Sequence, residues 1–311
     1  MPYIPHPISH PPMSVLFDSF REWRAALAAT PQPAWQPVLA YEQQQHSRSE
    51  VNIWAGLETA YAVMKDAVHT GLTDDMTSLS GMIDNGAKKV ALAPVSVLGP
   101  QFQKLLAYTL AAKEVNSCMG RIVAAPTAGA SGIMPGVLVL LEELHQLERR
   151  CLLEGMLIGA GIALIIEKRA SIAGAVGGCQ AETGTAAAMA AGAIVHCLGG
   201  SFAQIEEAVA ITLMNMLGLV CDPVAGLVEV PCVKRNGSAS VIAFASAQIA
   251  LAGDSAVIPV DEVVDAMGEV GAAMETRYKE TALGGIANTP TARQIEARVL
   301  VHRVEEADED A

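Results

Sequence analysis

Charged and aromatic residues are scarce in this chain. Only 17% of its 311 residues are charged and 4% are aromatic, whereas 51% are hydrophobic. This composition excludes an intrinsically disordered protein, which combines low hydrophobicity with high charge. Basic residues are also in the minority, with 20 Lys and Arg against 33 Asp and Glu and a formal net charge of −13. We therefore expect no nucleic-acid-binding surface, because neutralising phosphates requires clustered Lys and Arg.

Several familiar motifs are missing as well. The sequence contains no Cys-x-x-Cys pair, no Gly-x-Gly-x-x-Gly fingerprint and no Gly-x-x-x-x-Gly-Lys-Ser/Thr loop, so zinc ribbons and nucleotide sites have no support. The Pro-rich N-terminus does not resemble a secretory signal. The apolar run over residues 155–166 is too short to span a bilayer, and the run over 183–203 consists mainly of Ala and Gly. We expect a cytoplasmic protein that does not cross a membrane.

Small residues dominate the hydrophobic part of the chain and allow helices to pack closely. We predict a mainly α fold, a single Ala/Gly-rich helical domain over residues 15–300 with few short strands. Helical spacing of apolar residues predicts helices over 14–29 and 52–71, and the segments 89–94 and 228–233 are candidate strands. Residues 1–14 are expected to be disordered, and residues 301–311 to form an acidic tail.

Three loops rich in Gly, Ser, Thr and Ala precede helix-compatible segments. They are Thr77–Gly81, Ala125–Gly132 and Ala175–Glu182. A helix N-terminus carries unpaired N–H groups and the positive end of the helix dipole, so it favours an anion. Each loop by itself is also compatible with ordinary helix capping. Three of them in one chain favour an anion-binding site.

The six cysteines fall into groups with different sequence surroundings. Cys151 and Cys197 belong to apolar helical segments and are expected to be structural, because a buried free cysteine packs like a small hydrophobe. By contrast, Cys179, Cys221 and Cys232 each lie at a break made by Gly or Pro. They are either ordinary buried cysteines in turns or metal ligands held at fixed angles. As ligands, three soft thiolates without a His and carboxylate cluster would favour an iron–sulfur cluster.

Four motifs together resemble the alpha chain of the iron–sulfur L-serine dehydratases. They cover residues 116–133, 177–182, 219–236 and 280–287, and the resemblance extends from about residue 15 to about residue 300. The intervals of 42 residues from Cys179 to Cys221 and 11 residues from Cys221 to Cys232 are similar to the ligand spacing of that family. One departure is Met82-Ile83 after Ser80-Gly81, where the family usually has two glycines and an aspartate.

The resemblance implies a function and a set of site residues. It implies a lyase that converts L-serine to pyruvate and ammonia and holds a [4Fe-4S] cluster through Cys179, Cys221 and Cys232, with one iron open as a Lewis acid for the substrate hydroxyl. The substrate-binding residues that it implies are Ser78, Ser80, Gly81, Asn116, Thr127, Gly129, Ser131, Lys234, Arg235 and Asn236. Glu280 is a further candidate, whereas Glu182 is also explained as an ordinary first-turn helix carboxylate.

The resemblance also implies a partner and leaves one role open. Single-chain relatives carry an additional regulatory domain, so this chain resembles the catalytic half of a two-chain enzyme with a beta chain. Pyridoxal phosphate is not expected, because none of the eight lysines lies in a Gly-rich phosphate-binding context. No histidine stands out as the general base, so we expect the base to come from the partner chain. Alternatives are an L-cysteine desulfidase of the same superfamily and a non-catalytic cluster-binding or sensor protein.

Overall fold

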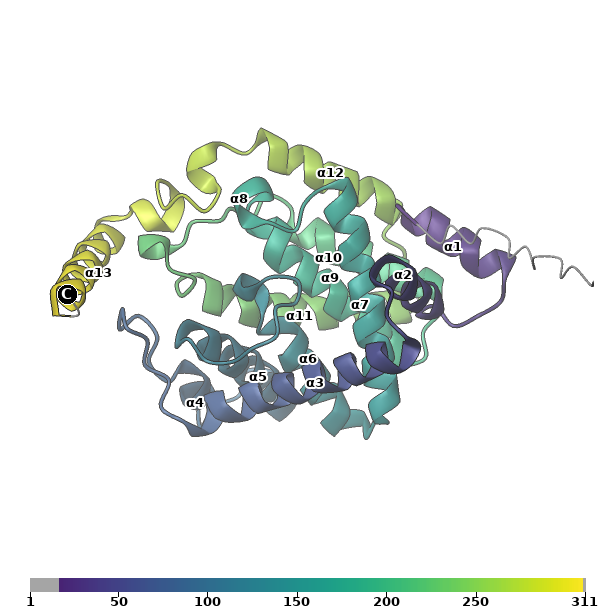
Figure 1. Cartoon of the computed structure of the whole chain (residues 1–311), viewed down its shortest axis with the longest axis horizontal. Coiled ribbons are helices and arrows are strands. Elements are labelled where there is room, and N and C mark those ends of the chain that lie inside the picture. The colour runs from purple at the N-terminus through teal and green to yellow at the C-terminus, as the bar shows by residue number, and fades with distance from the viewer. Residues whose placement is uncertain (1–16, 310–311) are drawn as a thin grey trace, which may run out of the picture.

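A computed structural model describes residues 17–309, and it is built from helices (Figure 1). Within this part of the chain there is no β-strand, and only isolated bridges join Thr77 to Asp84 and Cys221 to Lys279. The mainly α fold predicted from the sequence is therefore confirmed. The predicted disordered segment, residues 1–14, lies outside the described residues.

The described part of the chain forms thirteen α-helices. The first seven are α1 (Phe20–Ala29), α2 (Gln36–His46), α3 (Glu50–Thr73), α4 (Gly86–Ala91), α5 (Pro100–Ser117), α6 (Ile133–His145) and α7 (Arg149–Arg169). The remaining six are α8 (Gly174–Gly177), α9 (Thr185–Cys197), α10 (Phe202–Met216), α11 (Cys232–Leu251), α12 (Val260–Ala273) and α13 (Pro290–Glu309). A π-helical turn, Gln180–Gly184, leads directly into α9.

Helix α9 is the centre of the core. Nearly all of its residues are buried, and it packs against α6, α7, α10 and α11. Figure 1 shows it in the middle of the molecule, with α12 on one side and α3 on the other. Small residues make this arrangement possible: a Cβ on Gly192 of α9 would lie 2.3 Å from Cδ1 of Ile162 on α7. The close approach expected from the Ala/Gly-rich composition is thus present between these two helices.

Capping side chains decide where the N-terminal helices begin. Ser19 accepts a hydrogen bond from the Glu22 N–H at 3.1 Å, so α1 begins at Phe20. The helix predicted over residues 14–29 is therefore wrong at its N-terminal end, because Phe17 and Asp18 precede the cap and are not helical. Ser49 caps α3 in the same way, and that helix confirms the prediction over 52–71 with a few more residues at each end.

Neither candidate strand is present in the described structure. Residues 89–91 complete α4, and the apolar run over 228–233 is a turn followed by the first residues of α11. A short apolar run is equally compatible with a strand and with a buried helical turn, and here no partner strand exists to pair with it. In the described part of the chain, we also find no helix with the length and apolar character that a membrane crossing requires.

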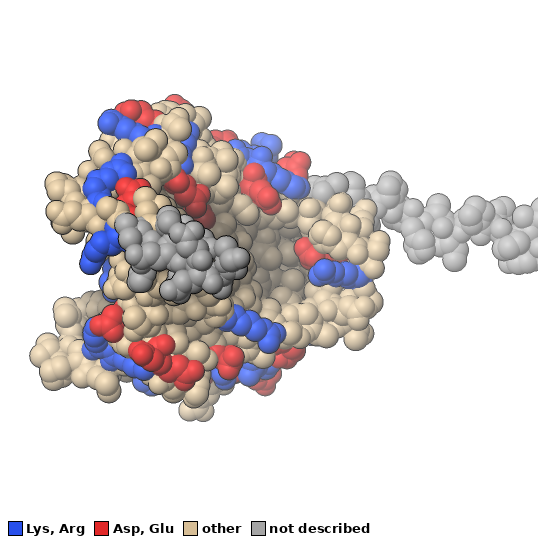
Figure 2. Space-filling model, turned by 60° about the vertical axis from the view of Figure 1, so that its left-hand side comes forward, with Lys and Arg blue, Asp and Glu red and all other residues tan. Residues whose placement is uncertain are grey.

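The C-terminal segment borders the site described below. Helix α13 contacts the short turn Val224–Gly226 and the turn Gly285–Asn288, and its backbone continues to Glu309, into the expected acidic tail. Figure 2 shows that the face presented on this side of the molecule is hollowed, and that most of the wall of the hollow carries no charged residue.

Candidate active site

Cys179, Cys221 and Cys232 are brought together from three separate segments of the chain. Cys179 follows Gly178, whose φ of +76° is a left-handed conformation that glycine adopts without strain. Cys221 lies in an extended segment, where its N–H donates to the Tyr278 carbonyl and its carbonyl accepts from the Glu280 N–H, both at 2.8 Å. Cys232 is the first residue of α11. All three side chains are buried.

The three thiols are close enough to affect one another electrostatically. Burial raises the pKa of each, and the pKa of Cys232 reaches about 12. The pKa of Cys221 is raised further by the charges of Cys179 and Cys232. Two cations act in the opposite direction: Arg235 favours the thiolate of Cys179, and Lys113 favours that of Cys232. Ionisation of one thiol therefore opposes ionisation of the others until a cation binds them.

This donor set fits an iron–sulfur cluster. Three buried thiols without a nearby histidine form a soft ligand set, and burial keeps such sulfurs away from solvent. The absence of a side chain at Gly174 lets the backbone lie close to Cys221, because a Cβ there would be only 3.1 Å from its Sγ. Among the described residues, no three His, Cys, Asp or Glu side chains surround the position of a single metal ion. The thiolates of a cluster bind different irons, so they need not converge on one point. The cluster stays a prediction.

Cys151 and Cys197 lie elsewhere, as expected for structural cysteines. They belong to α7 and α9, and each sulfur contacts the backbone carbonyl of the other residue, at 3.8 Å and 3.5 Å. His196, beside Cys197, pairs with Glu154 at 3.3 Å, and burial lowers its pKa. These residues hold α7 against α9 and do not contribute to the three-cysteine site.

Glu182 occupies the space between the cysteines and the loop 125–132. Its carboxylate accepts a hydrogen bond from Oγ1 of Thr127 at 2.8 Å, and a Cβ on Gly174 would lie 2.7 Å from its Oε2. Burial raises its pKa, and the charge of Glu280 raises it further. Glu182 belongs to the π-helical turn after Cys179, which is a common feature of functional sites. Its spacing of three residues from Cys179 fits both a capping role and a role in the site.

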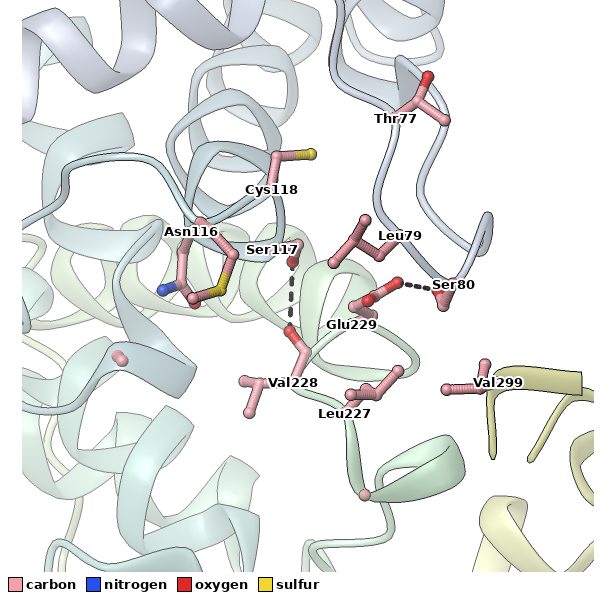
Figure 3. A pocket seen from close by; sticks show the side chains of 13 residues that line it. Thr77, Leu79, Ser80, Asn116, Ser117, Cys118, Leu227, Val228, Glu229 and Val299 are labelled. Carbon is pink, nitrogen blue, oxygen red and sulfur yellow. Dashed lines mark hydrogen bonds between the residues drawn. The ribbon is translucent and has the colours of Figure 1, made fainter. Parts of the chain in front are cut away.

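Ser78 and Ser80 turn their hydroxyls toward a residue that sequence analysis missed. Oε2 of Glu229 accepts from both hydroxyls, at 2.6 Å from Oγ of Ser78, and Figure 3 shows the contact with Ser80. Gly81 forms the following turn with a φ of +72°. Glu229 lies only three residues before Cys232, inside one of the four motifs, but nothing in the sequence indicates that it faces a loop 150 positions away.

The loop 125–132 is held by Asn236 and contains a buried hydroxyl without a partner. Asn236 accepts from the Gly132 N–H at 3.0 Å and donates to the Gly129 carbonyl at 2.9 Å, so its amide positions this loop on α11. Ser131 is fully buried, and within the described structure its Oγ has no hydrogen-bond partner. A buried polar atom without a partner carries a free-energy cost that a bound ligand would remove.

Arg235 and Lys234 differ in their surroundings. Nη1 of Arg235 lies 2.8 Å from Oδ1 of the buried Asp222 and donates to the Val220 carbonyl at 2.8 Å. Asp222 also accepts from the Ile286 N–H at 2.6 Å and so holds the motif 280–287 against the cysteines. Lys234 is exposed and lies on the side of Gly86, away from this network.

Lys113 was not singled out by sequence analysis, although it lies inside the site. Its side chain is fully buried on α5, and its Nζ donates to Oδ1 of Asn116 and, at 3.1 Å, to the Val228 carbonyl. Ser117 donates to the same carbonyl at 3.2 Å (Figure 3). Sequence analysis had no signal for Lys113, because one lysine in a helical segment is usually exposed.

An open cavity of about 640 Å³ adjoins these residues. Asn116, Ser80 and Glu229 contribute polar groups to its wall, and Leu227 and Val299 contribute apolar ones (Figure 3). Val299 belongs to α13, so the C-terminal helix forms part of the cavity wall. The site therefore combines a buried group of thiols, a hydroxyl-rich loop and an accessible cavity.

Comparison with known proteins identifies the family of this arrangement. The family model described as "Serine dehydratase alpha chain" matches residues 32–287. The chain belongs to this family. Among its relatives is the L-serine dehydratase alpha chain of Peptoniphilus asaccharolyticus, 45% identical over 83% of this chain and 89% of the relative. A probable L-serine dehydratase alpha chain of Bacillus subtilis (strain 168) is 42% identical over 85% of this chain and 88% of the relative.

A second kind of relative is longer. The L-serine dehydratase of Streptomyces coelicolor is 39% identical over 80% of this chain, but the match covers only 56% of the relative. The corresponding share of the L-serine dehydratase TdcG of Escherichia coli (strain K12) is 55%. This chain thus matches nearly the full length of relatives named alpha chain and about half of these longer ones.

Proposed function

We propose that this chain is the alpha subunit of an enzyme that deaminates L-serine to pyruvate and ammonia, and that Cys179, Cys221 and Cys232 hold a [4Fe-4S] cluster. The observation that carries the proposal is that three buried thiols, from segments far apart in the sequence, lie near one another and beside the loop that carries the unpartnered Ser131 hydroxyl. The names of the relatives support the reaction and the substrate.

The reaction requires help at two carbon atoms. Serine loses the proton on Cα and hydroxide from Cβ, which leaves aminoacrylate and one water. Aminoacrylate tautomerises to an imine, and water then hydrolyses the imine to pyruvate and ammonia. Hydroxide is a poor leaving group, and when bound, a cluster with one iron free of protein thiolates supplies the Lewis acid that promotes its departure.

The residues of the chain bind and orient the substrate. Ser131 would donate its free hydroxyl to the serine carboxylate, next to the N-terminal end of α6, where the helix dipole favours an anion. Thr127 and Glu182 lie between this loop and the cysteines and would face the substrate amino group, whose positive charge suits a carboxylate. Glu229 fixes Ser78 and Ser80 and so shapes the adjoining cavity wall.

A second chain would complete the site. Leu79 and Met119 line the cavity, yet their side chains are 83% and 87% exposed, which is unfavourable for apolar groups left in water. The name alpha chain of the relatives implies a partner, and we propose that this partner covers these residues and supplies the general base. We also propose that the enzyme acts in the cytoplasm, where its six free cysteines remain reduced.

The test is anaerobic reconstitution of the chain with iron and sulfide, alone and with its co-expressed beta chain, followed by pyruvate and ammonia assays. We expect pyruvate from L-serine with the beta chain present, and loss of both cluster and activity in C179S, C221S and C232S. C151S is the matched control and should keep both, because Cys151 belongs to α7 and contacts α9 away from the three-cysteine site. Absence of inorganic sulfide from the wild-type protein, or faster turnover of L-cysteine than of L-serine, would contradict the proposal.

A further inference from the structure

Lys113 is a buried cation that contacts no acidic side chain of the described residues. Its side chain has no solvent exposure, and none of the ion pairs formed among the described residues includes it. The two acceptors of its ammonium group, Oδ1 of Asn116 and the Val228 carbonyl, are both neutral. Lysine is almost never fully buried unless it is paired, because removing the charge from water is costly.

The other cation of the site is compensated, which makes Lys113 distinctive. Arg235 lies 2.8 Å from the Asp222 carboxylate, so this pair adds no net charge to the site. The groups whose negative charge would raise the pKa of Lys113 are, in order of strength, the thiolate form of Cys232, Glu182 and Glu229. Glu229 is already engaged by two serine hydroxyls, and Glu182 by Thr127. The packing places Lys113 near Cys232: its Cβ and the Asn236 side chain both lie against Gly132, and Nδ2 of Asn236 donates to the Cys232 carbonyl at 2.9 Å.

We propose that Lys113 supplies the buried positive charge that balances the thiolate-bound cluster held at Cys179, Cys221 and Cys232. The inference rests on the proposed function, because it needs those three residues to carry thiolates. Lys113 is a positioning residue for this purpose: its ammonium is held by Asn116 and Val228, behind the cavity wall, and acts on the cluster through its charge. The same contacts fix Asn116 toward the cavity.

The charge is expected to change two measurable properties of the cluster. A nearby positive charge favours the reduced state of an iron–sulfur cluster, so its removal should lower the reduction potential. It also offsets the repulsion among three thiolates, so its removal should speed the loss of iron to a chelator. Burial lowers the pKa of Lys113 to about 8 in the chain without metal, which leaves the group mostly protonated at neutral pH.

The experiment compares wild type, K113M, K113R and K104M after anaerobic reconstitution. Lys104 is the matched control on the same helix, exposed and paired with Glu143 at 3.0 Å. We expect K113M to show a lower potential and at least fivefold faster iron release, K113R to stay within twofold of wild type, and K104M to be unchanged. A wild-type protein without a cluster would refute the proposed function and this inference together.

Two other outcomes would overturn the inference alone. If wild type and K113M hold the cluster with the same potential and the same release rate, Lys113 does not balance its charge. If K113M only raises KM for L-serine and leaves both cluster properties unchanged, Lys113 acts on the substrate carboxylate instead. Circular dichroism and thermal unfolding of the metal-free variants check that K113M is folded.

Discussion

Replacing Lys113 by methionine should change how the stability of the metal-free chain depends on pH. Lys113 is fully buried, and desolvation lowers its pKa from 10.5 to about 8. The native state therefore releases this proton at a lower pH than the unfolded chain does. Between these two values the unfolded chain binds more protons, so the free energy of unfolding rises with pH.

The expected size follows from the two pKa values. At about 1.4 kcal/mol per pH unit, the change from 10.5 to about 8 corresponds to about 3 kcal/mol. This penalty is fully present below pH 8 and is lost as the pH rises toward 10.5. K113M lacks the group, so its stability relative to wild type should fall by about 3 kcal/mol over this interval. Titrations of other groups cancel in the difference, because both proteins contain them.

The assay is urea unfolding of the metal-free proteins at a series of pH values from 7 to 10.5, followed by circular dichroism. K104M is the control, and its free energy of unfolding should change with pH almost as that of wild type does, since Lys104 is exposed and paired with Glu143. Chelator and a reductant are present throughout, so that metal binding and thiol oxidation do not contribute. If the free energies of unfolding of K113M and wild type change with pH in parallel, the conclusion that the Lys113 ammonium is buried without a compensating charge is wrong.

Three further changes test other parts of the structure. G285A should destabilise the chain by about 2–4 kcal/mol in urea unfolding, because a Cβ there would lie 2.2 Å from Oδ2 of Asp222. G253A is its control: Gly253 also has a positive φ but open space around it, so this substitution should cost only about 1 kcal/mol. S131A should leave unfolding nearly unchanged but raise KM for L-serine about tenfold, and an unchanged KM would remove Ser131 from the substrate site. Burial raises the pKa of Glu206 to about 7, above its usual 4.5, so the free energy of unfolding of wild type should fall as the pH rises through this range. E206Q lacks this titration and should not show that fall. If the unfolding temperatures of the two proteins change equally with pH, this reasoning is wrong.

Local features of the fold were predictable to the extent that they depend on local sequence. The helix over 50–73 was found almost completely, because the helical spacing of its apolar residues is visible in the sequence. The start of α1 was misplaced, because apolar residues at helical spacing continue upstream of Ser19, whereas the helix begins only after this cap, with Phe20 and Trp23 buried in the core. The candidate strands failed for a similar reason: their apolar residues are buried, but against helices.

Sequence analysis singled out the three cysteines of the candidate site, whose role as ligands stays a prediction, but not all of its charged residues. Cys179, Cys221 and Cys232 were singled out by their Gly and Pro neighbours, and the fold brings these three together. Glu229 and Lys113 were missed, because their partners, Ser78 and Val228, lie more than a hundred positions away in the sequence. Arg235 was considered for a substrate carboxylate, and the structure pairs it with Asp222.

The amino-acid sequence alone determined the helical class, the close packing allowed by Ala and Gly, and the residue types with which a soft metal can bond. These properties depend on composition and on neighbours within a few residues, where backbone preference and side-chain chemistry act directly. Only the tertiary structure decided which polar groups face one another. Burial sets the cost of each unpaired charge or hydroxyl, and burial depends on contacts between segments that no local pattern specifies. Hence Lys113, an ordinary residue in the sequence, is a buried cation that forms no ion pair within the described part of the chain.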